Sequence, residues 1–337
     1  MKQKHWKFWV PLLLVPLPFM VLSMFLGRYS VSGKEVLTVL LHFFGLTSES
    51  VSRESFAVVT QLRLPRIIAG AFVGAGLSVS GAAFQGVFHN PLISPGLLGV
   101  TAGAGFGAAL SILFFPVAWG SYVSAFLFGS VAVLMSYWVA RIYRTVPTVM
   151  LVLGGTVVTA IFNALISLLK YIADPERQLP AIVYWLMGDI SGVEYTDFWA
   201  LLPIFAGVAI LIASGWRINI LSMGDKEAQA MGVPVRRSKN LIIMAATLST
   251  AGAVCLAGNI GWVGLVIPHI SRMLVGNDNR KLLPVSMVVG AAFMVIVDTA
   301  SRTVAQAEIP LGILTSLIGA PFFIYLLKKT KGGGWRA

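Results

Sequence analysis

The sequence predicts an all-α, polytopic membrane protein with about ten transmembrane helices, and two observations carry this prediction. Of the 337 residues, 57% are apolar and only 11% are charged, whereas a soluble domain has roughly 25% charged residues. Apolar stretches of about 20 residues, the length of a bilayer-spanning helix, recur along the whole chain. A soluble fold could not bury so much apolar surface, so the chain is expected to lie in lipid.

Other composition features exclude further classes. Period-two alternation is absent, which argues against a membrane β-barrel. The net charge of +12 would indicate nucleic acid in a soluble protein, but here topology explains it, so no nucleic-acid partner is expected. The single cysteine, Cys255, excludes an intramolecular disulfide. The N-terminal apolar run after Lys7 ends at Gly27-Arg28 without a signal-peptide cleavage site, which favours a retained first span.

Ten apolar segments follow one another along the chain, and each is interpreted as a span. They are Phe8–Gly27, Ile67–Phe84, Leu97–Phe115, Gly120–Ala140, Val149–Tyr171, Phe198–Ser214, Leu241–Ala257, Trp262–Val275, Pro284–Ala300 and Leu311–Leu327. The eighth segment is short and contains Pro268, so we expect it to be bent or to cross incompletely.

The connections between the segments predict the orientation. With both termini in the cytoplasm, most of the 25 lysines and arginines fall in cytoplasmic tails and loops, as the positive-inside rule requires. Two polar-rich connections, near 28–62 and 172–197, then lie outside. The first contains apolar residues at helical spacing, which predict an amphipathic helix at the membrane surface. These residues are Val36, Leu37, Leu40, Leu41 and Phe44.

Glycines are spaced four residues apart in two of the predicted spans. Gly99, Gly103 and Gly107 share one helical face, and so do Gly70 and Gly74. Small residues at this spacing let helix backbones approach closely in lipid. We expect these glycines to pack helices of the same chain against each other.

The sequence shows no catalytic motif. Gly33-Lys34 is followed by Glu35 and does not form a phosphate-binding loop. The four histidines are scattered and match no metal-ligand spacing. We therefore expect a protein that is not an enzyme and holds no cofactor or metal. If it transports with ATP, a separate chain must hydrolyse the nucleotide.

The most informative loop spans about 216–238, on the predicted cytoplasmic side. Asp225 is suited to cap a short helix over Lys226–Met231, Gly232 is suited to a left-handed terminating position, and Pro234 prevents continuation. Such a helix could dock into a groove of a partner protein. A surface helix that merely joins two spans is the alternative.

Blocks of sequence along nearly the whole chain resemble the FecCD-type permease subunits of bacterial ABC importers for iron–siderophores, haem and cobalamin. Any one block would be weak, but all occur in order and at the family's spacing. The blocks are LRLPR at Leu62–Arg66, Gly74–Gly99, YWLMGDI at Tyr184–Ile190, GDKEAQAMG at Gly224–Gly232, Ala257–Pro284 and Ala307–Leu327.

The resemblance implies partners and a single permease domain over residues 1–337. Permeases of this type have ten spans, pair with a second permease subunit, dock two cytoplasmic ATPases and receive cargo from an extracytoplasmic binding protein. They lie in the bacterial cytoplasmic membrane, in contact with lipid. The segment that inserts into the ATPases corresponds here to 225–232, with these residues in the contact: Asp225, Glu227, Ala228, Met231 and Gly232.

The resemblance also assigns residues to docking and gating. Arg63, Arg66 and Arg302 match positions that meet acidic residues of the binding protein, for which arginine offers bidentate, charge-assisted pairs. Arg302 could instead pair with Asp298, four residues earlier. The residues that match the cytoplasmic gate are Asn90, Leu92 and Thr148.

Two alternatives stay open at this stage. An ion-coupled secondary transporter could use Asp298, Arg302 and Glu308 as a charge relay, although all three are expected near the outer helix ends. For Glu308, a favourable position before the last helix is the simpler explanation. Ferric siderophore is the expected cargo, with haem or cobalamin as alternatives, and the second permease subunit can be identical or related.

Overall fold

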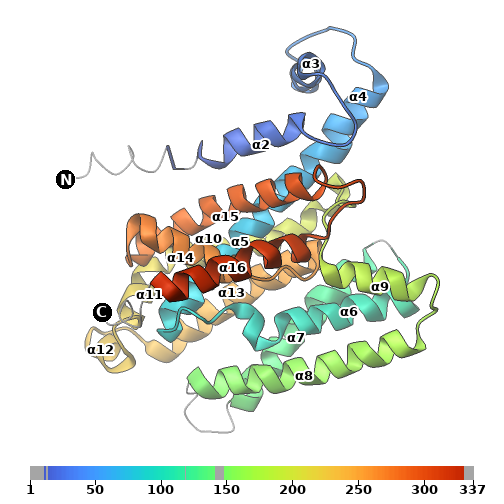
Figure 1. Cartoon of the computed structure of the whole chain (residues 1–337). Helices are drawn as coiled ribbons and strands as arrows, with labels where there is room; N and C mark the ends of the chain where they lie inside the picture. Colours follow the sequence, from blue (N-terminus) through green and yellow to red (C-terminus); the bar gives the residue numbers. More distant parts are fainter. Residues whose placement is uncertain (1–10, 13, 118, 141–147, 330–337) are drawn as a thin grey trace.

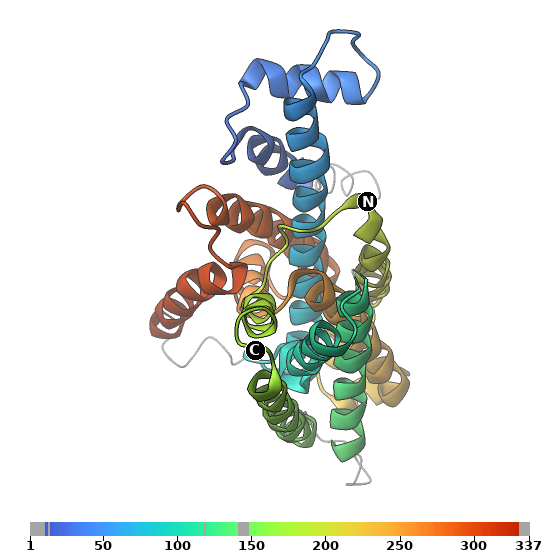
Figure 2. The ribbon, with the colours of Figure 1, turned by 90° about the vertical axis from the view of Figure 1, so that its right-hand side faces the viewer.

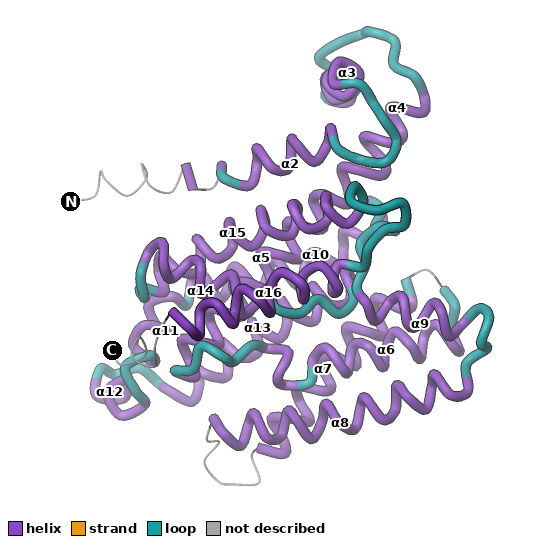
Figure 3. Tube along the Cα trace, in the orientation of Figure 1, coloured by secondary structure: helices purple, strands orange, loops and turns teal. Residues whose placement is uncertain are grey.

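The computed structural model describes residues 11–329 except 13, 118 and 141–147. In this part of the chain all regular structure is helical (Figure 3), and a helix occupies each of the ten predicted segments. Residues 8–10 of the first segment lie outside the described residues. The ten helices are α2 (Pro16–Phe25), α5 (Leu64–Phe88), α6 (Val100–Phe114), α7 (Gly120–Ala140), α8 (Thr148–Ile172), α10 (Leu201–Ala213), α13 (Val235–Ala257), α14 (Val263–Val275), α15 (Asn279–Ser301) and α16 (Leu311–Lys329).

Six helical stretches of the described chain are long and apolar enough to cross a membrane. They are Arg53–Val87, Gly120–Ala140, Met150–Ile172, Tyr195–Ala213, Val235–Ala257 and Asn279–Ser301. The four other predicted spans, α2, α6, α14 and α16, are apolar but shorter. Helix α14 has 13 residues and continues through Pro268. The protein is thus an all-helical, multi-pass membrane protein.

Helix α5 lies at the centre of the bundle (Figures 1 and 2). In the helical stretch Arg53–Val87, which contains α5, 83% of the most apolar part is buried inside the chain. The corresponding share is 78% for α13 and 67% for α15. The corresponding share is 33% for α7, α8 and the stretch containing α10. Helices α5, α13 and α15 therefore form the core, whereas α7, α8 and α10 present most of their apolar surface outward.

The α5–α15 seam, defined here by Gly74 and Gly290, brings two helix backbones together. A Cβ atom built on Gly74 would lie 2.8 Å from the Gly290 carbonyl carbon and 2.6 Å from Met294 Cγ. Between α6 and α7, Cβ atoms on Gly103 and Gly107 would likewise meet backbone of the neighbouring helix. The predicted close approach of helices is confirmed at Gly74, Gly103 and Gly107. It is wrong for Gly99, which is the left-handed N-cap of α6 and precedes the helix, and a Cβ atom on Gly70 would meet only the Ile190 side chain.

The two polar-rich connections contain helices of their own. The predicted amphipathic helix is α3 (Gly33–Phe43), which begins with a reciprocal capping box between Ser32 and Glu35 and buries Val36 and Val39. The second connection contains α9 (Gln178–Met187), which was not predicted. The other short helices are α4 (Arg53–Ala57), η2 (Val58–Arg63), η3 (Pro95–Leu98), η4 (Tyr195–Ala200), α11 (Gly215–Leu221) and α12 (Asp225–Ala230).

The helices run between two ends of the molecule. At one end, called the α12 end, lie α11, α12 and the turn between α14 and α15 (Figure 1). At the other, called the α3 end, lie α3, α4, α9 and the connection from α15 to α16. In the described part of the chain, the predicted cytoplasmic loops near 215–240 and 276–283 and the predicted external segments near 28–62 and 172–197 are therefore at opposite ends. Which end faces the cytoplasm stays a prediction.

Candidate functional site: a coupling helix and an arginine cluster

Helix α12 starts differently from the prediction. Its N-cap is Gly224, with φ at +126°, and no side chain caps the helix. Asp225 is the first helical residue, and its carboxylate accepts a hydrogen bond from Lys239 Nζ of α13 at 2.7 Å. The predicted capping by Asp225 is therefore wrong, because the carboxylate is drawn to the cation of the following helix. This ion pair fixes α12 against α13.

The end of α12 follows the prediction. Gly232 has a left-handed backbone, with φ at +78°, and its N–H donates to Gln229 O at 2.9 Å. The N–H of Val233 donates to Ala228 O at 3.0 Å, and α13 begins directly after Pro234. A left-handed residue after the last turn is the common way to end a helix, and glycine adopts it without strain.

The predicted coupling residues divide into one buried residue and an exposed face. Ala228 is fully buried, whereas Glu227 and Gly232 are exposed and Met231 is 54% exposed. A Cβ atom added to Gly232 would meet no atom within 4 Å. The helix is thus anchored through Ala228 and presents an amphiphilic surface at the α12 end.

Helix α11 joins this region to the core helices through a set of contacts called the inner clamp, formed by Asn219, Asp278, Asn279, His89 and the carbonyl of Leu221. Asn219 Nδ2 donates to Asp278 Oδ1 at 2.6 Å. Asn219 Oδ1 accepts from the backbone N–H and the side-chain amide of Asn279 at 2.7 and 2.9 Å. His89 Nε2 donates to Leu221 O at 2.7 Å.

The inner clamp ties α11 to the end of α5 and to the start of α15. His89 is the C-cap of α5 and has a left-handed φ of +49°, and Asp278 is the N-cap of α15. Burial alone would raise the pKa of Asp278, but hydrogen bonds from Asn219 and Arg280 lower it below its usual value. No sequence motif predicts a role for Asn219 or His89, although His89 lies in the family block Gly74–Gly99.

The predicted gate residues lie at the α12 end. Asn90 Oδ1 accepts a hydrogen bond from Leu92 N at 2.9 Å and shapes the turn after α5, and Leu92 is 49% exposed. Thr148 is the first residue of α8, and its side chain lies outside the described part of the chain.

The predicted docking arginines converge at the α3 end, in what we call the arginine cluster: Arg63, Arg66, Arg302, Asp298 and Glu308. Arg66 Nε donates to Asp298 Oδ1 at 2.6 Å, and Arg66 Nη1 donates to Glu308 Oε2 at 2.9 Å. Arg302 Nε lies 3.6 Å from Asp298 Oδ2. The pairing of Arg302 with Asp298 that the sequence left open is therefore present.

The three arginines are held within the chain. Arg63 donates to the backbone carbonyls of Met24 and Tyr29, and Arg302 Nη2 donates to Ser23 O at 2.8 Å. Their exposed fractions are only 4 to 6%. A cavity of about 220 Å³ adjoins them, and its charged lining residues are Arg28, Arg63, Arg66, Arg302 and Glu308. An incoming group would reach the arginines from this cavity.

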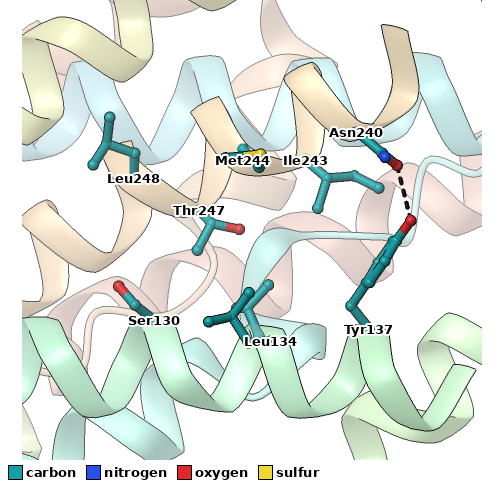
Figure 4. A pocket seen from close by; sticks show the side chains of 9 residues that line it. Ser130, Leu134, Tyr137, Asn240, Ile243, Met244, Thr247 and Leu248 are labelled. Carbon is teal, nitrogen blue, oxygen red and sulfur yellow. Dashed lines mark hydrogen bonds between the residues drawn. The ribbon is translucent and has the colours of Figure 1, made fainter. Parts of the chain in front are cut away.

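A second cavity, of about 270 Å³, lies between α7 and α13 (Figure 4). Its lining is mostly apolar, and Tyr137 donates a hydrogen bond to Asn240 Oδ1 at 3.0 Å across one end. It contains no carboxylate, histidine or cysteine. Among the described residues, no group of three His, Cys, Asp or Glu side chains could hold a metal ion.

Comparison with known proteins extends over nearly the whole chain. The molybdate import system permease protein MolB of Haemophilus influenzae is 41% identical over 315 residues, 93% of either chain. The cobalamin import system permease protein BtuC of Halobacterium salinarum is 43% identical over 273 residues, 80% of this chain and 73% of that one. A probable iron chelatin transport system permease protein of Helicobacter pylori is 36% identical over 319 residues, 93% and 95% of the two chains.

A solved structure gives the same result. An inward-facing metal-chelate type ABC transporter matches with a TM-score of 0.85 and 39% identity, over 96% of this chain and 100% of that one. The model of the FecCD transport family matches residues 12–329. The chain is therefore a member of the FecCD transport family, a permease subunit of the ABC importer type.

Proposed function

We propose that this chain carries a ferric siderophore across the bacterial cytoplasmic membrane as one permease subunit of an ATP-driven importer. In this proposal residues 1–337 form one permease domain. It pairs with an identical or related permease, and two ATPase subunits bind at the α12 end. The observation that carries the proposal is the exposed, independently anchored helix α12, at the opposite end from the arginine cluster.

Helix α12 is the proposed contact with the ATPase. Met231 supplies an exposed apolar surface, Glu227 supplies a charge, and Gly232 leaves open space for a partner to approach. Asp225 and Ala228 hold the helix on its own chain through the Lys239 ion pair and the buried methyl group. A short helix fixed in this way can transmit a push without first folding on its partner.

The inner clamp is the proposed route of that push. Helix α12 follows α11, and α11 is hydrogen-bonded to the end of α5 through His89 and to the start of α15 through Asn219. A displacement of α12 would therefore act on two core helices together. Such a contiguous set of contacts is a physical means of coupling nucleotide hydrolysis to helix movement. The proposed inner gate, at Asn90, Leu92 and Thr148, lies at the same end.

The arginine cluster is the proposed docking site of the extracytoplasmic binding protein. Its three guanidinium groups can pair with acidic side chains of a partner, and charge pairs of this kind both orient a complex and speed its formation. Because the arginines are buried, docking would take place from the adjoining cavity, where Arg63, Arg66 and Arg302 all contribute to the lining.

The proposed cargo is inferred from relatives. Relatives are described as permeases for iron chelates, iron(3+)-hydroxamate and hemin, which supports a ferric chelate. A second candidate is molybdate, favoured by the relative that matches 93% of both chains. Cobalamin is supported in the same way.

Reconstitution of the purified complex in liposomes tests the proposal. Radiolabelled ferric siderophore should accumulate only when ATP, the ATPase subunit and a binding protein are all present. Uptake of molybdate instead would overturn the cargo alone. Uptake that needs only an ion gradient and no ATPase would favour the secondary transporter and refute the whole proposal. Purified material that lacks any associated ATPase would contradict it as well.

A further inference from the structure

The arginine cluster contains more positive than negative charge. It holds three guanidinium groups and two carboxylates. Arg66 and Arg302 pair with the carboxylates of Asp298 and Glu308, whereas Arg63 donates to backbone carbonyls. Two of their donor atoms, Arg66 Nη2 and Arg302 Nε, and one acceptor atom, Asp298 Oδ2, are buried without a hydrogen-bond partner among the described residues. Buried polar atoms normally have partners, and buried charges are normally paired. The unpaired donors outnumber the unpaired acceptor, so the cluster has an excess of positive charge that favours an anionic partner.

The two carboxylates bind Arg66 in different ways. Asp298 is within helix α15, its side chain is 1% exposed, and its two oxygens face Arg66 and Arg302. Glu308 is on the connection from α15 to α16, its side chain is 23% exposed, and among the described residues it forms an ion pair with Arg66 only. Asp298 is thus fixed by the fold, whereas Glu308 can leave Arg66 by rotation of an accessible side chain.

Glu308 also borders the cavity from which the arginines are reached. The cavity of about 220 Å³ is lined by Glu308 together with Arg66 and Arg302. Arg28, which also lines the cavity, donates a hydrogen bond to Gln306 O on the same connection. A carboxylate entering the cavity would therefore meet Arg66 at the place that Glu308 occupies.

We propose that Glu308 is a resident competitor for the docking site. In the undocked chain its carboxylate occupies Arg66 Nη1. A carboxylate on the extracytoplasmic binding protein displaces it, while Asp298 keeps Arg66 and Arg302 aimed at the cavity. The partner's carboxylate thus enters a preformed anion site. Docking breaks the Arg66–Glu308 ion pair and replaces it with an ion pair between Arg66 and the partner. This inference rests on the proposed docking role of the cluster.

Two carboxylate-to-amide variants give opposite expectations. The assay is the Kd of the binding protein that supports uptake in the reconstitution, measured on the complete importer in lipid nanodiscs. E308Q removes the competitor and should tighten Kd by about tenfold, the effect of one charge-assisted hydrogen bond. D298N removes the group that positions both arginines and should weaken binding by at least as much. E308D keeps the charge but shortens the side chain and should fall between wild type and E308Q.

A matched control separates displacement from general electrostatics. E49Q makes the same charge change at an exposed glutamate on the loop before α4, so it should leave Kd within about twofold of wild type. Equal tightening by E49Q and E308Q would overturn the proposal. Unchanged or weaker binding by folded E308Q would also overturn it.

A direct measurement of displacement uses a spin label on A307C, since Ala307 is exposed next to Glu308 and the chain's single cysteine, Cys255, is buried. The label should become more mobile when the binding protein docks, and an unchanged spectrum would contradict the exchange. Failure of the proposed docking itself is distinguishable. In that case R66A would bind as wild type does, or wild type would bind no such protein, and both conclusions would fall.

Discussion

Substitution of Gly74 in the α5–α15 seam should destabilise the protein, because the two helix backbones lie in contact there. In G74A the new methyl carbon would start 2.8 Å from the Gly290 carbonyl carbon and 2.6 Å from Met294 Cγ. Carbon atoms in contact lie about 3.5 to 4.0 Å apart. The two helices must therefore separate by roughly 0.7 Å or more, because a carbonyl group within a helix cannot rotate away.

The expected cost follows from two opposing effects. Overpacking a close contact costs typically about 1 to 3 kcal/mol, and a backbone clash should lie at the upper end. Alanine regains about 1 kcal/mol over glycine in a helix interior. The net loss is about 2 kcal/mol, or roughly a 30-fold change in the ratio of folded to unfolded protein.

Titration of the purified protein with SDS, followed by tryptophan fluorescence, measures this loss. G74A should unfold at lower SDS than wild type. The control is G192A, because a Cβ atom on Gly192 would meet nothing within 4 Å, and it should unfold as wild type does. Coincident unfolding curves for G74A and G192A would refute the reasoning, since they would mean that the seam relaxes without cost.

Three further predictions concern the α12 end. G232N should leave the SDS unfolding midpoint unchanged, because asparagine tolerates a left-handed backbone and the added atoms meet open space. The variant should nevertheless abolish uptake while ATP hydrolysis continues, and normal uptake would contradict the coupling role. N219A loses the hydrogen bonds to Asp278 and Asn279 and should cost about 1 to 3 kcal/mol of stability. It should also lower the uptake per ATP hydrolysed, and an unchanged uptake per ATP would exclude the inner clamp as the route of coupling. Folding lowers the pKa of Asp278, so its stabilising contribution is present above its unfolded pKa and is lost as pH falls through the folded pKa. D278N should therefore reduce the loss of stability at acid pH, and a loss as steep as in wild type would contradict this.

The features that the sequence predicted correctly depend on local pattern. Ten runs of apolar residues gave ten helices, because in lipid the backbone must satisfy its own hydrogen bonds wherever the chain is apolar. Gly232 ends α12 because a left-handed residue there depends only on its neighbours. The amphipathic helix α3 follows from spacing, and its capping box lies within four residues.

The features that the sequence did not predict depend on contacts between distant residues. Asp225 was expected to cap α12, but Lys239, 14 positions later, takes its carboxylate. Arg66 meets Asp298 across 232 positions of sequence, and no local spacing signals that contact. Asn219 and His89 have no motif of their own either. Their roles appear only when α11 is placed against α5 and α15.

The placement of the inner clamp has a thermodynamic consequence. Its hydrogen bonds join α11 to the same two helices whose far ends hold Arg66 and Asp298, and the glycine seam keeps those helices from separating midway. A displacement at either end should therefore move α5, α11 and α15 together as one rigid body. Linkage is reciprocal, so if arrival of a loaded partner alters nucleotide affinity, bound nucleotide must alter the partner's affinity by the same factor. One measured ratio would fix the other.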